Sequence, residues 1–436
     1  MTKGRQVLAI LVQRIDSFIT PDRLRVYPMI FAVMSGVALL ASSVTRVVLP
    51  AAQGPFLPDY LAHWTGGGLL LAGEPAALYD PQVQQAFQER ALGPVTTLAW
   101  FVSPAVVAAS YAPLALMPYN LSALIWLAVS AALLVACTLS LSLFAPQLML
   151  HKRKVVLLAV FASPAVFELL GGGQDSAFVL AVWLLGIRFL SAGHNYSAGA
   201  ILGLGFAKPQ LFVLVPIVLL ATRNFRALAG FVAVFSLLAG VSVGLVGVDG
   251  MARWVSALSS PLYTEQVQQG QAWKMIGLPS LVQGLLPPAW AGWTAPVLTV
   301  AALPVGAAIL LFHLCRTRKR PADPVLVWLT TLATTVVFSP HIATYDGVLL
   351  VPVLAYLLEY HSSPMVRAST VGALGLLWLG PVFHQIAVQL AVWPLDVIDA
   401  PWAALPLAVL WRELLRPLST FENPVKTMHP HPQGLT

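Results

Sequence analysis

The sequence predicts an all-α polytopic membrane protein, on three observations. Hydrophobic residues make up 58% of the 436 positions and charged residues only 9%, whereas a soluble fold has about a quarter of its residues charged. The apolar residues form runs long enough for membrane helices, and the polar residues collect at the breaks between those runs. Lipid is therefore expected to solvate most of the surface.

The apolar runs place ten membrane helices. Several of them are shorter than the roughly 20 residues needed to cross a bilayer, so we expect about 10–14 spanning or half-spanning helices. The expected spans are 27–49, 120–144, 155–170, 174–191, 226–248, 295–314, 325–338, 344–361, 366–387 and 400–411.

Two further apolar stretches are interrupted by proline. Pro104 and Pro113 break the stretch 100–118, and Pro209 breaks the stretch 197–220. Because proline removes a backbone donor and disrupts a helix, we predict that each stretch is a hairpin of short helices. Such a hairpin enters the membrane and returns to the same side, packed against protein or lining a cavity.

The ends of the chain are expected to lie in the cytoplasm. Residues 1–26 lack the apolar core and cleavage site of a signal peptide, so the first apolar segment should remain as an anchor. We expect a cytoplasmic segment 1–26, a membrane domain 27–416 and a disordered cytoplasmic tail 417–436.

The charge distribution agrees with this topology. Most of the 24 Lys and Arg residues fall on the side assigned to the cytoplasm, as the positive-inside rule requires. The two long outer loops are 50–99 and 249–294. The basic residues assigned to the outer side are Arg46, Arg90, Lys208, Arg253 and Lys274.

Polar residues also interrupt helices on the outer side at three shorter breaks. These are Gly171–Asp175, Lys208–Gln210 and Ser339–His341, the last followed by Tyr345 and Asp346. Charge close to lipid is costly and is usually kept for function. The pattern therefore predicts a polar cleft that opens outward.

Asp59, in Pro58-Asp59-Tyr60, is the first candidate for chemistry. A carboxylate near the membrane surface and beside aromatic residues can act as a general base towards an acceptor hydroxyl. The alternative is a helix N-cap, because aspartate is common at that position.

Lys208 and His341 are candidates for binding an anion. A lysine at a proline-broken helix end places a cation beside free backbone amides, which suits a phosphate, although it could also be a lysine that extends to the interface. His341 could donate to a phosphate or transfer a proton, with Asp346 orienting it, or the two could simply pair or cap helices.

The remaining polar and aromatic residues admit two interpretations. Gln174 and Asp175 follow three glycines, which permit close backbone approach to a ligand or form a tight turn. Trp254, Tyr263, Trp273, Trp290 and Trp293 could stack on sugars or form an interfacial aromatic belt.

The sequence gives little support for several other chemistries. No two acidic residues are adjacent or one position apart, which disfavours a divalent metal site, and no nucleotide-binding loop occurs. The cysteines, Cys137 and Cys315, cannot form a disulfide framework. Basic residues in short loops make nucleic acid an improbable partner. We therefore expect no metal and no cofactor.

The order of the motifs resembles glycosyltransferase family 87, whose members include polyprenol-phosphate-mannose-dependent mannosyltransferases. The resemblance covers roughly residues 27–390. It rests on Pro58-Asp59-Tyr60 with Leu61–Trp64, Leu71–Pro81, Ala112–Tyr119, Gly173-Gln174, Lys208-Pro209-Gln210 and Ser339-Pro340-His341 with Tyr345-Asp346.

The resemblance implies a GT-C fold with its active-site cleft on the extracytoplasmic face of a bacterial plasma membrane. Asp59 matches the family's proposed catalytic aspartate, and Lys208 and His341 match polar positions that would hold the donor phosphate. The residues expected to support the site or bind substrate are Tyr60, Gln174, Asp175, Gln210, Tyr345 and Asp346.

The implied reaction is inverting transfer of a sugar from a polyprenyl-phosphate donor. We expect mannose, the family's best-known sugar, and a glycolipid or lipid-linked glycan as acceptor. The alternatives are a secondary transporter or lipid flippase, which would place polar residues in broken helices of two related halves, and a scaffold without catalysis. A scaffold would be favoured if Asp59, Lys208 and His341 lay far apart.

Overall fold

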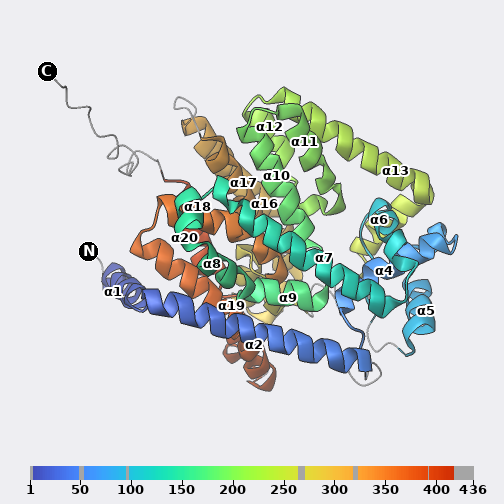
Figure 1. Cartoon of the computed structure of the whole chain (residues 1–436), viewed down its shortest axis with the longest axis horizontal. Coiled ribbons are helices and arrows are strands. Elements are labelled where there is room, and N and C mark those ends of the chain that lie inside the picture. The colour runs from blue at the N-terminus through green and yellow to red at the C-terminus, as the bar shows by residue number, and fades with distance from the viewer. Residues whose placement is uncertain are drawn as a thin grey trace.

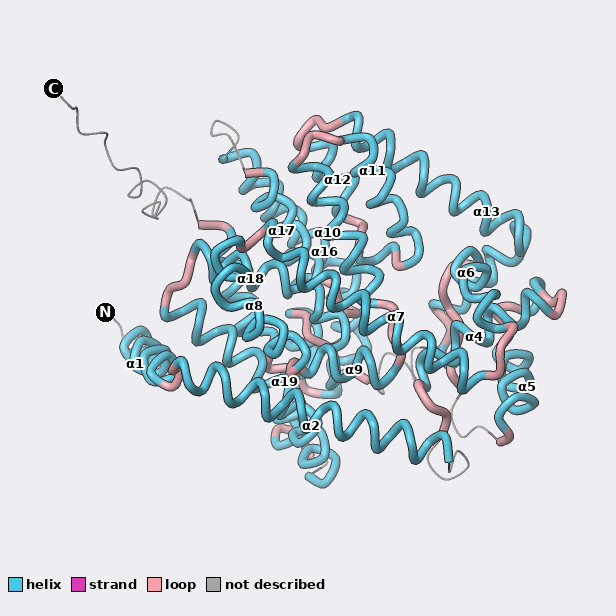
Figure 2. Tube along the Cα trace, in the orientation of Figure 1, coloured by secondary structure: helices cyan, strands magenta, loops and turns pink. Residues whose placement is uncertain are grey.

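The computed structural model describes residues 3–48, 54–94, 98–263, 271–317, 323–390 and 392–416, and this part of the chain is helical with no named strand (Figures 1 and 2). The α-helices of eight or more residues are α1 (Lys3–Ser17), α2 (Pro21–Val48), α4 (Pro58–Leu71), α5 (Pro81–Leu92), α6 (Ala105–Ala115), α7 (Tyr119–Ser140), α8 (Pro146–Phe161), α9 (Pro164–Gly172), α10 (Ser176–Ser191), α11 (Asn195–Gly203), α12 (Leu214–Ala221), α13 (Phe225–Leu258), α15 (Leu278–Leu285), α16 (Ala291–Thr317), α17 (Pro324–Phe338), α18 (Val351–Tyr360), α19 (Pro364–Leu390) and α20 (Ala404–Leu414).

Five of the described helices, α2, α7, α13, α16 and α19, are long and apolar enough to cross a membrane. A sixth span is possible if α8 and α9, which are bent by 55° at their junction, count as one. The long helices leave many large apolar side chains exposed, among them Met34 of α2, Leu237 of α13 and Phe312 of α16. Apolar surface on this scale is stable only in lipid. The chain is a multi-pass membrane protein.

The remaining expected spans are shorter or broken. The expected span 155–170 is divided by the bend between α8 and α9, and 344–361 is a 3-10 helix, η8 (Thr344–Leu350), followed by α18. The apolar helices α10 and α17 have 16 and 15 residues. Both are packed inside the molecule, where Trp183 and Leu329 are fully buried. Their apolar composition reflects protein burial as well as lipid.

The second proline-broken stretch is a hairpin, as predicted. α11 and α12 are joined through two short 3-10 turns around Lys208. The ends of the hairpin meet, because Asn224 Nδ2 donates to Asn195 Oδ1 at 2.9 Å.

The prediction for the first stretch, 100–118, is wrong. It contains a single helix, α6, which includes Pro113. The proline falls in the last turn of an 11-residue helix, where the loss of one backbone donor is tolerated, and α6 packs tightly on α4.

The outer segments are largely helical. The segment 50–99 contains α4 and α5, and the expected loop 249–294 begins inside α13, which continues to Leu258 beyond a break at Gly247. The expected tail 417–436 lies outside the described residues.

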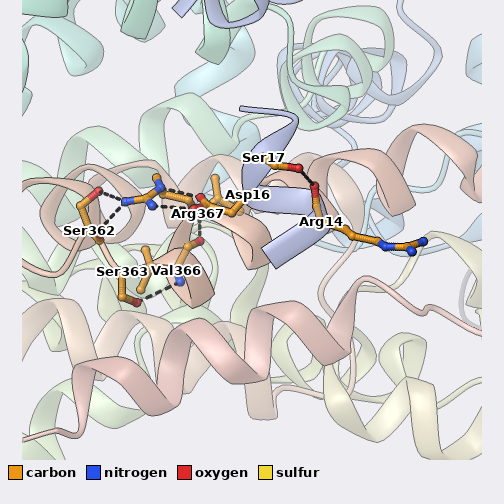
Figure 3. Close-up of polar contacts among 8 residues, drawn as sticks. Arg14, Asp16, Ser17, Ser362, Ser363, Val366 and Arg367 are labelled. Atoms are coloured by element: carbon orange, nitrogen blue, oxygen red, sulfur yellow. Dashed lines mark hydrogen bonds and ion pairs between the residues drawn. The ribbon is translucent and has the colours of Figure 1, made fainter. Parts of the chain in front are cut away.

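The N-terminal segment is anchored to α19. Arg367 binds both carboxylate oxygens of Asp16, each at 2.7 Å, and its Nη1 donates to the Ser362 carbonyl at 2.6 Å (Figure 3). α1, α19 and α20 gather at the left of Figure 1, opposite α4, α5 and α6.

Candidate active site

Asp59 lies in the first turn of α4, behind a strained residue. Leu57 has a left-handed backbone with φ 49°, which is unusual for a residue other than glycine. The Tyr119 hydroxyl binds the carbonyls of Phe56 and Leu57, the latter at 2.8 Å. The N-cap residue of α4 is Leu57, and Asp59 lies inside the first turn, so Asp59 is not the N-cap. Backbone strain of this kind often occurs at functional sites.

The carboxylate of Asp59 faces the end of α9. A methyl group at Gly172 would lie only 2.3 Å from Asp59 Oδ2, so the carboxylate occupies the space that glycine leaves. Gln174 hydrogen-bonds the carboxyl group. Gly173 adopts φ 77°, and its carbonyl accepts from Trp126 Nε1 at 2.9 Å. The three glycines thus form a tight turn and also allow close approach of Asp59.

The environment of Asp59 combines exposure to solvent with desolvation of its carboxyl group. The residue is exposed to solvent, and the surrounding protein nevertheless desolvates its carboxyl group. Burial raises the pKa of Asp59, while Gln174, Lys274, His63 and Lys208 oppose that rise. A carboxylate with a raised pKa is a stronger base.

Lys208 is the centre of a buried cluster. Its Nζ lies 2.6 Å from Asp175 Oδ1 and 3.6 Å from Asp346 Oδ1. Ser176 donates to Asp346 Oδ1 at 2.5 Å, and the Lys208 ammonium lies 5.5 Å from the centre of the Tyr345 ring. Two carboxylates surround one lysine, so the cluster has a net negative charge.

His341 lies on a segment that is paired with the outer segment near Lys274. Ile276 N donates to the Ile342 carbonyl, and Thr344 Oγ1 to the Lys274 carbonyl, both at 2.9 Å. Ser280 Oγ donates to the Pro340 carbonyl at 3.1 Å. We call 274–280 and 339–344 the paired segments. Burial lowers the pKa of His341, so the ring is neutral near pH 7.

The structure brings the three principal candidates together. Asp59 and His341 each lie within electrostatic range of Lys208. The wide separation that would favour a scaffold is therefore not observed for these three residues.

The other expected residues divide between the site and its surroundings. Gln174, Asp175, Tyr345 and Asp346 belong to the site. Tyr60 is fully buried, with its hydroxyl 2.5 Å from Ser122 Oγ, so it supports α4 from behind. Gln210 is exposed and makes no hydrogen bond to a described residue of the cluster.

The aromatic residues of the outer segment also divide. Tyr263 is buried within electrostatic range of Lys208, and the Trp273 ring stacks on His384 with centroids 4.7 Å apart. Trp290 and Trp293 are exposed, as an interfacial belt requires.

Sequence reasoning missed several members of the site. Ser176 gives no signal in the sequence because it stands at the start of an apolar helix. His63 lies in α4 near Asp59, and its ring stacks on Tyr111 with centroids 4.6 Å apart. Glu168 and Lys274 lie within electrostatic range of each other and of Asp59. Glu168 also lines a small pocket with Trp273, Asp399 and Trp402.

Comparison with known proteins agrees with this geometry. The model of glycosyltransferase family 87 matches residues 100–340, more than half of the chain. The match contains Asp175 and Lys208, ends one residue before His341 and begins after Asp59. No curated protein and no solved structure matched the chain. The chain therefore belongs to glycosyltransferase family 87.

Proposed function

We propose that the protein transfers a sugar from a polyprenyl-phosphate donor to a hydroxyl of a glycolipid or lipid-linked glycan, with inversion at the anomeric carbon. The proposed sugar is mannose. The observation that supports it most directly is Asp59, a solvent-exposed carboxylate with a raised pKa that lies within electrostatic range of Lys208.

The proposed reaction is a direct displacement. Asp59 takes the proton of the acceptor hydroxyl as that oxygen attacks the anomeric carbon. The bond between this carbon and the phosphate oxygen breaks, and its electron pair leaves with the polyprenyl phosphate. A β-linked donor then gives an α-linked product. The leaving group is already activated, so the protein has to supply a base, positioning and stabilisation of charge.

His341 and Lys208 are proposed to face the donor phosphate. A neutral histidine still donates one N–H, and the Lys208 ammonium has three. Asp175 and Asp346 offset the Lys208 charge, so Lys208 would contribute a hydrogen bond and the orientation of its cluster more than net attraction.

The proposed setting is a GT-C architecture with the cleft on the extracytoplasmic side and both chain ends in the cytoplasm. The positions of α1 and α20 on one side of the molecule and of α4 and α5 on the other support this topology. The breaks between half-spanning helices would give both lipids a lateral path to Asp59.

The test is sugar transfer by the purified protein in lipid, with a panel of polyprenyl-phosphate sugars as donors and a total lipid extract as acceptor. The proposal predicts transfer from one donor class and an inverted linkage in the product, read by NMR. The alternative, a transporter or flippase, would move the labelled lipid across the bilayer without forming a new glycosidic bond.

A further inference from the structure

A phosphate at this site needs more positive charge than Lys208 and His341 supply. The Lys208 cluster, with Asp175 and Asp346, is net negative. Asp59 adds a further carboxylate within electrostatic range. An anionic donor would therefore meet net repulsion unless another cation is present.

Of the five basic residues on the proposed outer side, four already contact another group through their charged ends. Arg46 donates to the Pro55 carbonyl, Arg90 to the Ala86 carbonyl and Arg253 to the Ala76 carbonyl. Lys208 pairs with Asp175. Lys274 alone among these five has an ammonium without a hydrogen bond or ion pair to a described residue.

Among the five, Lys274 is also the residue whose backbone lies on the segment paired with 339–344, which carries His341. Its carbonyl accepts from Thr344 Oγ1 at 2.9 Å, and the next residue, Met275, forms a β-bridge with Ala343. Its ammonium lies 5.2 Å from the centre of the Trp273 ring, and it acts electrostatically on both Asp59 and Glu168. The backbone is held in place while the charge remains available.

We infer that Lys274 is the principal cation for the donor phosphate, acting with His341 on the paired segments. This inference rests on the proposed function, because it identifies the residue that recognises the anionic group of the same donor. Lys274 meets the phosphate directly, whereas Lys208 is occupied in holding Asp175 and Asp346.

The experiment measures binding of undecaprenyl phosphate to the full-length protein in phosphatidylcholine nanodiscs, with undecaprenol as the uncharged comparison. Lys274→Gln should weaken phosphate binding about tenfold to a hundredfold, the range for loss of one charged hydrogen-bond partner. It should leave undecaprenol binding unchanged. Lys274→Arg should retain most of the affinity, and Arg253→Gln, which removes a charge on the same side, should have no effect.

The Gln substitution keeps the backbone contact to Thr344, so it should preserve the fold, and an unchanged melting temperature checks this. Wild-type affinity of Lys274→Gln for undecaprenyl phosphate would overturn the inference. Sugar transfer with such an unaffected variant would leave the proposed function standing. Phosphate binding that depends on Lys274, without transfer from any donor, would instead support the anion site and reject the transferase reaction.

Discussion

Asp59 depends for its position on a neighbour without a side chain. Because a methyl group at Gly172 would lie 2.3 Å from Asp59 Oδ2, Gly172→Ala should displace the carboxylate. A misplacement of about 1 Å can cost about a hundredfold in rate, so we predict a fall in kcat of tenfold or more. Gly171→Ala is the matched control, because its methyl group meets only Leu39 Cδ2 at 3.2 Å. Equal rates for both variants would contradict the proposed role of Asp59.

The raised pKa of Asp59 sets the pH dependence of transfer. A general base must be ionised, so the rate should fall as the pH falls through the pKa of Asp59, above the ordinary range of aspartate. Gln174 opposes the rise, so Gln174→Leu should move this acid limb to higher pH. Single-turnover rates across pH measure the acid limb of the wild-type protein and that of Gln174→Leu. An acid limb at the ordinary aspartate value, or one that Gln174→Leu does not move, would argue against Asp59 as the base.

Lys208 stabilises the fold through its ion pairs, whereas Lys274 makes no ion pair with a described residue. Lys208→Met would leave Asp175 and Asp346 buried without their counter-charge, and breaking a buried pair in this way costs about 3–5 kcal/mol. Thermal unfolding in detergent should show a large drop in Tm. Adding Asp175→Asn should recover part of the loss. Lys154→Met removes an exposed lysine of α8 and should leave Tm unchanged; a similar drop there would show that the effect is not specific to the pair.

Individual residues were partly predictable from the sequence. Asp59, Lys208 and His341 were recognisable because charge is rare in this chain and falls at helix breaks. Their partners were not, because Ser176 and Asp346 are 170 positions apart and only the packing of α10 against η8 brings them together. Lys274 carries no such signal in the sequence, because its segment is paired with 339–344 only in the folded chain.

At the scale of elements, α4 is held against α6 by glycine. A methyl group at Gly67 would lie 2.8 Å from the Tyr111 backbone of α6, whereas Gly68 faces the Phe87 ring of α5. Overpacking of such a contact costs about 1–3 kcal/mol, so Gly67→Ala should lower Tm and also transfer, since α4 positions Asp59. Gly36→Ala on α2, where nothing lies within 4 Å, should be neutral. An unchanged Tm for Gly67→Ala would show that the α4–α6 contact does not support the site.

The prediction of elements succeeded where hydrophobic runs were long. It failed at one of the two proline-containing stretches, because a proline can either end a helix or lie within one. At Lys208-Pro209 the α-helix is interrupted, and the chain forms two 3-10 turns between α11 and α12. Pro113 does not interrupt its helix, since it lies near the end of α6 and disrupts little of the helix. Sequence alone does not separate these cases, because the difference lies in how much helix follows the proline and in what the helix packs against.

On the scale of the whole molecule, composition predicted correctly that apolar residues would cover most of the surface. Long helices such as α2 and α13 are largely exposed and apolar, whereas α10 and α17 are short and buried. The polar residues are therefore excluded from the lipid face and gather between the helices. Composition predicts that separation but does not predict which polar groups come close to one another.

The most direct test of the central claim is single-turnover transfer by Asp59→Asn, a nearly isosteric variant, from the donor that the wild-type protein uses. The account predicts that transfer falls by at least about a hundredfold, while donor affinity stays at the wild-type value. Transfer at the wild-type rate by Asp59→Asn would contradict the assignment of Asp59 as the base and, with it, the proposed mechanism.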